Sequence, residues 1–225
     1  MNALVVYAHQ EPTSLTASLK NVTLKLLTAA GHNVVETDLY GLGFHPAAEL
    51  FDFNVKSEEH FNYLTEQKYA SMHNMAFSPD ITSEMEKLKN AEMVVFHFPV
   101  WWSAPPAILK GWLDRVLAMG FAWDGHGRIY QNGLMKGKRA LVVTTAGDGA
   151  DSYTPTGEHK ASLDQLLFPL LHSTLGFCGF DVLQPYILYD VLDKNAEQLA
   201  SMVELYRGYL ERSLAAPQYY LRQSV

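Results

Sequence analysis

Three runs rich in apolar residues constrain the fold of this chain more than any other feature. They are 3–8 (ALVVYA), 93–100 (MVVFHFPV) and 139–146 (RALVVTTA). Each has the length of a strand, and the first is apolar throughout, which is typical of a strand that is buried on both faces. Further strands are expected around Val34 and Val35 and over 180–188. Longer segments separate the runs, so the chain alternates between strand and helix, which predicts a parallel sheet covered by helices on both faces.

The segments between the runs carry apolar residues at helical spacing. In the first of them the apolar positions are Leu15, Leu19, Val22 and Leu26. Gly31 marks the expected end of that helix. Asp80 is the expected N-cap of a helix over 80–90, and Pro106 suits the first turn of the next helix. The remaining helices are expected over 163–177, with an interruption near Pro169, and from Ala196 to Leu210.

The length and the element order predict one α/β domain over 1–225, with a doubly wound, five-stranded parallel sheet. A chain of 225 residues that is 48% hydrophobic has enough apolar material for a sizeable core. The segment at about 41–79 is too long for a plain connection. We therefore expect it to form an inserted lobe that packs against a ligand or a partner subunit.

Charge and composition exclude several classes of function. The net charge of −7 leaves no basic footprint for nucleic acid. Cys178 is the only cysteine, so the chain cannot form an internal disulfide, as suits a reducing compartment. The N-terminus lacks a basic region, and the most apolar stretch, 91–102, is too short to span a bilayer. We expect a cytoplasmic protein without membrane insertion. The nine histidines are scattered, with no HExxH or CxxC pair, so no metal site is expected.

The loop after the first strand, 9–16, combines hydroxyl groups with the start of a helix. Ser14 and Thr16 can donate hydrogen bonds, and the helix N-terminus offers free N–H groups that suit a phosphate. The alternative is that Thr13 or Ser14 is only an N-cap. Neither the P-loop pattern GxxxxGK[ST] nor the dinucleotide pattern GxGxxG follows the strand.

Two further loops follow strands that should end at the same edge of the sheet. Residues 99–106 contain the adjacent pair Trp101 and Trp102, which could stack on a flat cofactor or pack in a core or subunit contact. Residues 144–159 combine glycines with Tyr153 and His159, which could carry a proton or stabilise negative charge. The alternative for His159 is an ordinary surface histidine.

With these loops in view, the chain resembles the flavodoxin-like NAD(P)H quinone reductases, the family of DT-diaphorase. The matching stretches cover roughly residues 3–190, and the most specific is the proline–aromatic loop that runs into PAILKGW. The Tyr153-to-His159 spacing also matches. The stretches are 8–14, 38–40, 79–81, 97–116, 144–147, 153–159 and 177–185.

This resemblance implies a homodimer with one FAD, rather than FMN, per subunit at the dimer interface. Carried over by position, the residues around the flavin nucleotide are His9, Ser14, Leu15, Thr16, Ser18 and Asn62. Those around the flavin ring are Pro99, Val100, Trp101, Trp102, Ser103, Thr144, Thr145, Ala146 and Gly147. Tyr153, His159 and Gly147 are the implied catalytic residues. Trp102, Trp123, Phe177 and His159 are the implied walls of the acceptor pocket.

The chain also departs from the family pattern. Trp101 replaces a glutamine, Ala146 a glycine and Gly125 a frequent tyrosine, and one residue is inserted between Gly147 and Tyr153. These departures concern the acceptor and the nicotinamide more than the flavin.

The resemblance predicts an enzyme that takes a hydride from NADH or NADPH and passes it to a quinone, two electrons at a time, by a ping-pong mechanism. Two other functions stay open at this point: a flavodoxin-like electron carrier, and a regulatory subunit of a potassium-efflux transporter.

Overall fold

A computed structural model of the chain describes residues 1–57, 60–125 and 127–220. Its sheet has the order β2-β1-β3-β4-β5, with β6 also paired to β4, and every pair is parallel. This confirms the doubly wound α/β sheet. The strands are β1 (Asn2–Tyr7), β2 (Asn33–Asp38), β3 (Met93–Pro99), β4 (Arg139–Thr145), β5 (Asp181–Val182) and β6 (Tyr186–Leu188).

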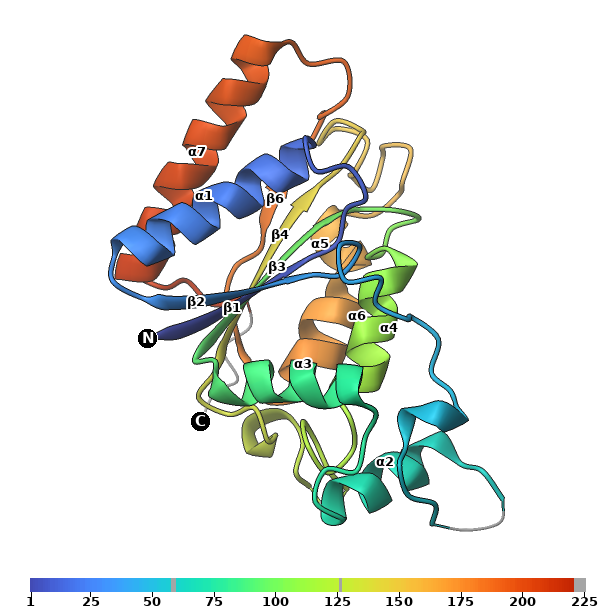
Figure 1. Cartoon of the computed structure of the whole chain (residues 1–225). Helices are drawn as coiled ribbons and strands as arrows, with labels where there is room; N and C mark the ends of the chain where they lie inside the picture. The colour runs from blue at the N-terminus through green and yellow to red at the C-terminus, as the bar shows by residue number, and fades with distance from the viewer. Residues whose placement is uncertain (58–59, 126, 221–225) are drawn as a thin grey trace.

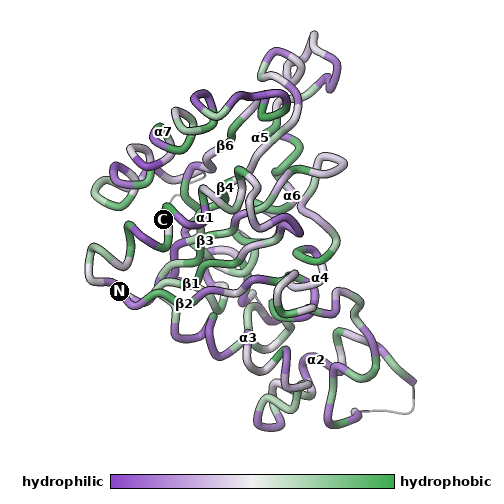
Figure 2. Tube along the Cα trace, turned by 45° about the horizontal axis from the view of Figure 1, so that its top comes forward, coloured by the Kyte–Doolittle hydropathy of each residue, from purple (hydrophilic) through white to green (hydrophobic). Residues whose placement is uncertain are grey.

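Helices cover both faces of the sheet (Figure 1). Helices α1 and α7 lie on one face, and α3, α4, α5 and α6 lie on the other. Successive strand residues point to opposite faces, so Val5 of β1 packs in the core under α1 and α7 while Leu4 and Val6 pack in the core of the other face. The helices are α1 (Leu15–Ala29), α2 (Tyr63–Met72), α3 (Pro79–Asn90), α4 (Ala107–Val116), α5 (Leu163–Leu166), α6 (Phe168–Leu170) and α7 (Ala196–Ala215). Hydrophobic and hydrophilic residues alternate along α7, as Figure 2 shows, because only one side of it faces the sheet.

Several expected boundaries differ from the structure. The strand expected over 180–188 is divided into β5 and β6, because the stretch between them contains Pro185, which lacks the N–H that a ladder needs. The helix expected over 163–177 breaks into α5, α6 and a π-helical segment, η3 (Leu171–Gly176). The N-cap of α3 is Ser78 and not Asp80, because Pro79 takes the first helical position. Pro106 is the N-cap of α4, one position before its first turn.

The described residues of the segment 41–79, which we call the lobe, carry the short helix η1 (Leu50–Asp52) and α2. A buried ion pair fixes the lobe to α4, since Nη2 of Arg115 lies 2.7 Å from Oδ1 of Asp52. The hydroxyl of Tyr63 donates to Asp52 at 2.6 Å, and the amide of Gln67 donates to the Asp114 carbonyl at 2.9 Å. Figure 1 shows α2 at the far end of the molecule from the carboxyl ends of the strands.

None of the helices in the described ranges is long and apolar enough to cross a membrane. Within the same ranges no group of three or more His, Cys, Asp or Glu side chains is placed to hold a metal ion.

Candidate active site

The loops that follow β1, β3 and β4 meet at one edge of the sheet, because these three strands are neighbours and run in the same direction. Hydrogen bonds join the loops directly. The amide of Val100 donates to the Thr145 carbonyl at 2.8 Å, and the Thr144 hydroxyl donates to the Phe98 carbonyl at 2.8 Å. The hydroxyls of Thr16 and Thr145 lie 3.1 Å apart in the interior. Strand order reverses between β1 and β3, which is where open α/β sheets bind their ligands.

The N-terminus of α1 fits an anionic group. Ser14 is its N-cap and accepts a hydrogen bond from the Ala17 amide at 3.1 Å. The amides of Leu15 and Thr16, the two residues before Ala17, have no acceptor within the helix. The first turn holds no acidic residue, so no carboxylate competes with a phosphate there.

Two other predicted residues of this loop are already engaged within the chain. The Ser18 hydroxyl donates to the Ser14 carbonyl at 3.2 Å. Nδ1 of His9 accepts from the Glu11 amide at 2.9 Å, which shapes the loop before the helix. Burial lowers the pKa of His9, so the neutral form is favoured near the anion site.

The tryptophan loop after β3 turns tightly. The amide of Trp101 donates to the Ala104 carbonyl at 2.9 Å, and the amide of Ala104 returns a bond to the Trp101 carbonyl at 3.1 Å. Trp102 and Ser103 have φ values of 51° and 59°, in the left-handed region that few residues of this type adopt. Trp102 is 100% exposed and Trp101 40% exposed. A fully exposed tryptophan on a strained turn points to a surface that a ligand or a partner covers.

The loop after β4 brings Tyr153 and His159 together. Their rings stack with centroids 4.1 Å apart and an interplanar angle of 14°. Burial, and then the negative charge of Asp148, raises the pKa of Tyr153, so its hydroxyl keeps its proton at neutral pH. Tyr153 therefore can donate a hydrogen bond into the space in front of the loop.

A fourth loop, between β6 and α7, joins this edge, and the sequence did not single it out. The Tyr189 ring lies 5.6 Å from the Tyr153 ring, and the Asp190 amide donates to the Asp148 carbonyl at 2.9 Å. A Cβ on Gly147 would lie 3.0 Å from Cδ1 of Leu192, so only glycine fits there without displacing that side chain. The sequence contained the information needed to predict this loop. Residues 189–195 follow the last strand expected in the sheet, and the loops that follow parallel strands lie at the same edge.

Asn62, Trp123 and Phe177 lie elsewhere in the chain. Asn62 caps α2 on the lobe, where it accepts from the Thr65 amide at 3.1 Å. Trp123 and Phe177 contact each other edge to face, with centroids 5.4 Å apart. Phe177 shortly precedes β5, whose first residue pairs with the first residue of β4. A seven-residue strand spans about 20 Å, and Tyr153 follows its other end. Within one chain, the predicted acceptor-pocket residues thus form two separate groups.

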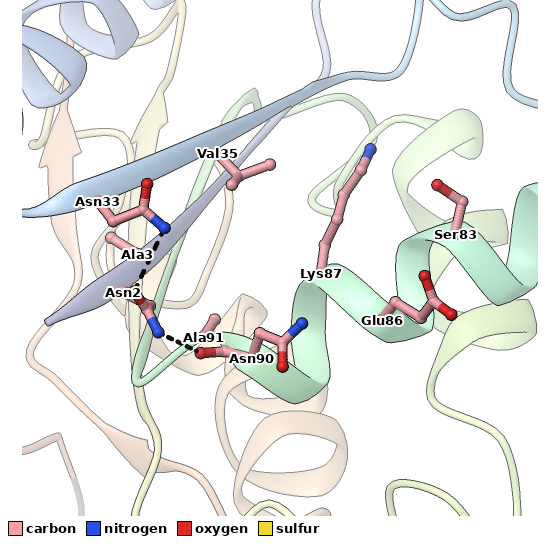
Figure 3. A pocket seen from close by; sticks show the side chains of 9 residues that line it. All are labelled: Asn2, Ala3, Asn33, Val35, Ser83, Glu86, Lys87, Asn90 and Ala91. Carbon is pink, nitrogen blue, oxygen red and sulfur yellow. Dashed lines mark hydrogen bonds between the residues drawn. The ribbon is translucent and has the colours of Figure 1, made fainter.

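A cavity of about 400 Å³ lies at the amino ends of β1 and β2, beside α3 (Figure 3). Its polar side chains bond to one another and to the backbone: Asn33 donates to Asn2 at 3.3 Å, and Asn2 donates to the Asn90 carbonyl at 3.2 Å. It lies at the opposite end of the sheet from Tyr153 and His159, so we assign it no part in their chemistry.

Comparison with known proteins places the chain in a family. The family model described as "Flavodoxin-like fold" matches residues 1–210. Human ribosyldihydronicotinamide dehydrogenase [quinone] is 42% identical over 210 residues, which cover 92% of this chain and 90% of the relative. Rat NAD(P)H dehydrogenase [quinone] 1 is 36% identical over 211 residues, which cover 93% and 76%.

A crystal structure from Klebsiella pneumoniae, described as that of a quinone reductase, superimposes with a TM-score of 0.91 at 36% identity. The superposition covers 97% of this chain and 86% of the Klebsiella protein. These matches confirm the resemblance drawn from the loop residues, and the chain belongs to the flavodoxin-like family that includes these quinone dehydrogenases.

Proposed function

We propose that the chain is an FAD-dependent NAD(P)H:quinone oxidoreductase that transfers two electrons by a ping-pong mechanism. One observation carries this proposal: the stacked pair of Tyr153 and His159 lies at the same sheet edge as the free N-terminus of α1 and the exposed tryptophan loop. Relatives that are 36–42% identical over most of their length are named as quinone dehydrogenases, which supports the same reaction here.

The residues at this edge fit a flavin nucleotide. The amides of Leu15 and Thr16 would hold the pyrophosphate, with Ser14, Ser18 and His9 around it. The ring would lie between the tryptophan loop (99–103) and residues 144–147. Within the second segment, Leu192 lies where a side chain on Gly147 would be. The fully exposed Trp102 would then be covered.

When bound, a flavin would supply the hydride chemistry between a reduced nicotinamide and the acceptor. The chain's own part is positional and electrostatic. The Tyr153 hydroxyl, protonated at neutral pH, would donate a hydrogen bond where negative charge develops. The imidazole of His159, stacked on the phenol, would hold the ring of that donor in place. Trp102 and Leu192 would keep water away from this space.

We further propose that two copies of the chain form the working enzyme. Asn62, Trp123 and Phe177 are separated from Tyr153 within one chain, and a second copy would bring them to the same pocket. The lobe offers apolar surface for such a contact: Phe51 is 79% exposed, Met72 71% and Leu64 50%. Sedimentation of the purified protein should give twice the mass of one chain, and a monomer that turns over quinone at full rate would contradict the dimer.

The decisive experiment is reconstitution followed by two half-reactions. Purified protein is loaded with FAD or FMN, the tighter ligand is identified, and flavin reduction by NADH and by NADPH is followed without oxygen. Menadione is then added to the reduced protein. We expect FAD to bind more tightly, reduction to need no quinone, and reoxidation by menadione to regenerate the starting spectrum.

Failure at different stages points to different functions. Tight FMN binding without steady NAD(P)H oxidation would instead indicate an electron carrier. Failure to bind either flavin would remove the proposed reaction altogether. Recovery with a membrane transporter whose flux it changes would indicate a regulatory subunit.

A further inference from the structure

An acidic residue of the loop after β4 contacts His159. Nε2 of His159 lies 2.9 Å from Oδ2 of Asp148, which is a hydrogen-bonding distance. The same imidazole presents its face to Tyr153. The ring is therefore held by a contact at its edge and a contact at its face, and both contacts come from the loop that carries His159 itself.

The backbone around Asp148 is itself fixed from outside the loop. The Asp148 carbonyl accepts from the Asp190 amide at 2.9 Å, and the Ala146 carbonyl accepts from the Val191 amide at 3.2 Å. His159 is fixed as well, because its amide donates to the Ser152 carbonyl at 3.0 Å. Backbone hydrogen bonds therefore fix the main chain at both Asp148 and His159, whereas two unrestrained surface side chains would have no such support.

We propose that Asp148 is a positioning residue, which holds the His159 imidazole through Nε2 in its stacked orientation on Tyr153. The proposal rests on the proposed oxidoreductase function. A carboxylate at Nε2 accepts the proton that this nitrogen carries, so Nδ1 is left as the nitrogen that can take up a proton. With its orientation fixed in this way, the imidazole keeps the stacked contact that holds the Tyr153 ring in place.

The exposure of the pair makes the proposal testable. The side chain of Asp148 is 54% exposed and that of His159 30% exposed. Ion pairs with this much exposure contribute little to folding, so removing Asp148 should leave the protein folded and its flavin bound. Asp151 provides a matched control. It lies on the same loop and is exposed, and its carboxylate makes no hydrogen bond with the described residues.

The test compares Asp148→Ala with Asp151→Ala, with and without FAD. The first readout is NMR of the His159 ring protons, which a stacked phenol shifts upfield and which give cross-peaks to the Tyr153 ring. We expect Asp148→Ala to lose the upfield shift and the cross-peaks, and Asp151→Ala to keep both. This readout does not depend on turnover, so it stands even if the oxidoreductase function is wrong.

The second readout is the rate of flavin reduction. We expect Asp148→Ala to slow it about tenfold, which is less than the roughly 10²–10⁴-fold that a positioned acid or base contributes itself. Asp148→Glu should recover part of the rate. An unchanged ring contact in Asp148→Ala would overturn the proposal, as would equal slowing in the two alanine variants, which would indicate a general effect of charge.

Discussion

The hydroxyl of Thr16, in the first turn of α1, lies 3.1 Å from the hydroxyl of Thr145, the last residue of β4, and both side chains are buried. This contact joins the proposed phosphate site to the loop that carries Tyr153 and His159. It crosses β1 and β3, so it holds two parts of the site in register that are 129 residues apart.

Replacing Thr16 by Val should destabilise the fold by about 1–3 kcal/mol, because the buried Thr145 hydroxyl loses its partner. The double variant with Thr145→Val should cost less than the sum of the two single variants, since it removes both polar groups together. Urea unfolding of the four proteins gives this comparison. Strict additivity would show that the two hydroxyls do not interact.

Replacing Tyr153 by Phe should slow flavin reduction about 10²-fold, because the substitution removes the hydroxyl and keeps the ring. Flavin affinity should change little. Because the pKa of Tyr153 is raised above its usual value near 10, the rate of the unaltered protein should show no loss from tyrosine ionisation up to about pH 9. Stopped-flow absorbance without oxygen measures both effects.

The control for that variant is Tyr189→Phe, whose ring lies against Tyr153. Slowing of the same size in both variants would argue for altered packing rather than a lost donor. An undiminished rate in Tyr153→Phe would remove the phenol from the mechanism.

Replacing Arg115 by Met should destabilise the protein by about 3–5 kcal/mol, because it leaves the carboxylate of Asp52 buried without its cation. The Nη1 group of Arg115 also bonds Asp80 at 2.8 Å, so α3 loses a partner as well. If 1–225 is one domain, the lobe should lose its protection from hydrogen exchange while the whole chain unfolds at lower urea in a single transition.

The exposed pair Lys110–Asp114 is the control for this prediction. Its atoms lie 2.7 Å apart, but its side chains are 61% and 47% exposed, so Lys110→Met should cost less than about 1 kcal/mol. Equal costs for the two variants would mean that the Arg115 pair does not anchor the lobe.

The sheet and its functional edge could be predicted because their signals are local. The runs that form β1, β3 and β4 are short and rich in apolar residues, and a parallel order then puts 9–16, 99–104 and 144–159 at one edge. The pairing of Tyr153 with His159 is implied by the family resemblance, because both residues lie in one of these loops at the spacing that the family shows.

The remaining features depend on contacts between distant segments. The contact of Asp148 with His159 needs a loop conformation that is set by Asp190 and Val191, which lie some forty residues further along the chain. The sequence predicts Asp80 as an N-cap, but in the structure its carboxylate accepts a hydrogen bond from Arg115, a residue 35 positions away. The spacing of apolar residues along the chain does not predict that Trp123 and Phe177 lie at the other end of the sheet from Tyr153.

His97 predicts how acid destabilises the fold. It lies in the middle of the sheet and is fully buried, with Nε2 at 3.0 Å from the Thr23 hydroxyl, while its Nδ1 has no hydrogen-bond partner among the described residues. Burial, and to a lesser degree the charge of Lys20, lowers the pKa of His97 to about 3. The folded protein therefore binds fewer protons at this site than the unfolded chain does below about pH 6.5.

The stability of the protein rises with pH wherever the unfolded state binds more protons than the folded state. The contribution of His97 is thus complete above about pH 6.5 and is lost as the pH falls toward 3. Between pH 7 and pH 5 the loss should be about 2 kcal/mol from this one residue.

In His97→Leu the Thr23 hydroxyl keeps its bond to Tyr206 at 2.6 Å, so the variant should fold and its stability should fall less between these pH values. Urea unfolding at both pH values, with the exposed His60→Gln as control, measures the difference, and equal losses in all three proteins would show that His97 is not the group that titrates.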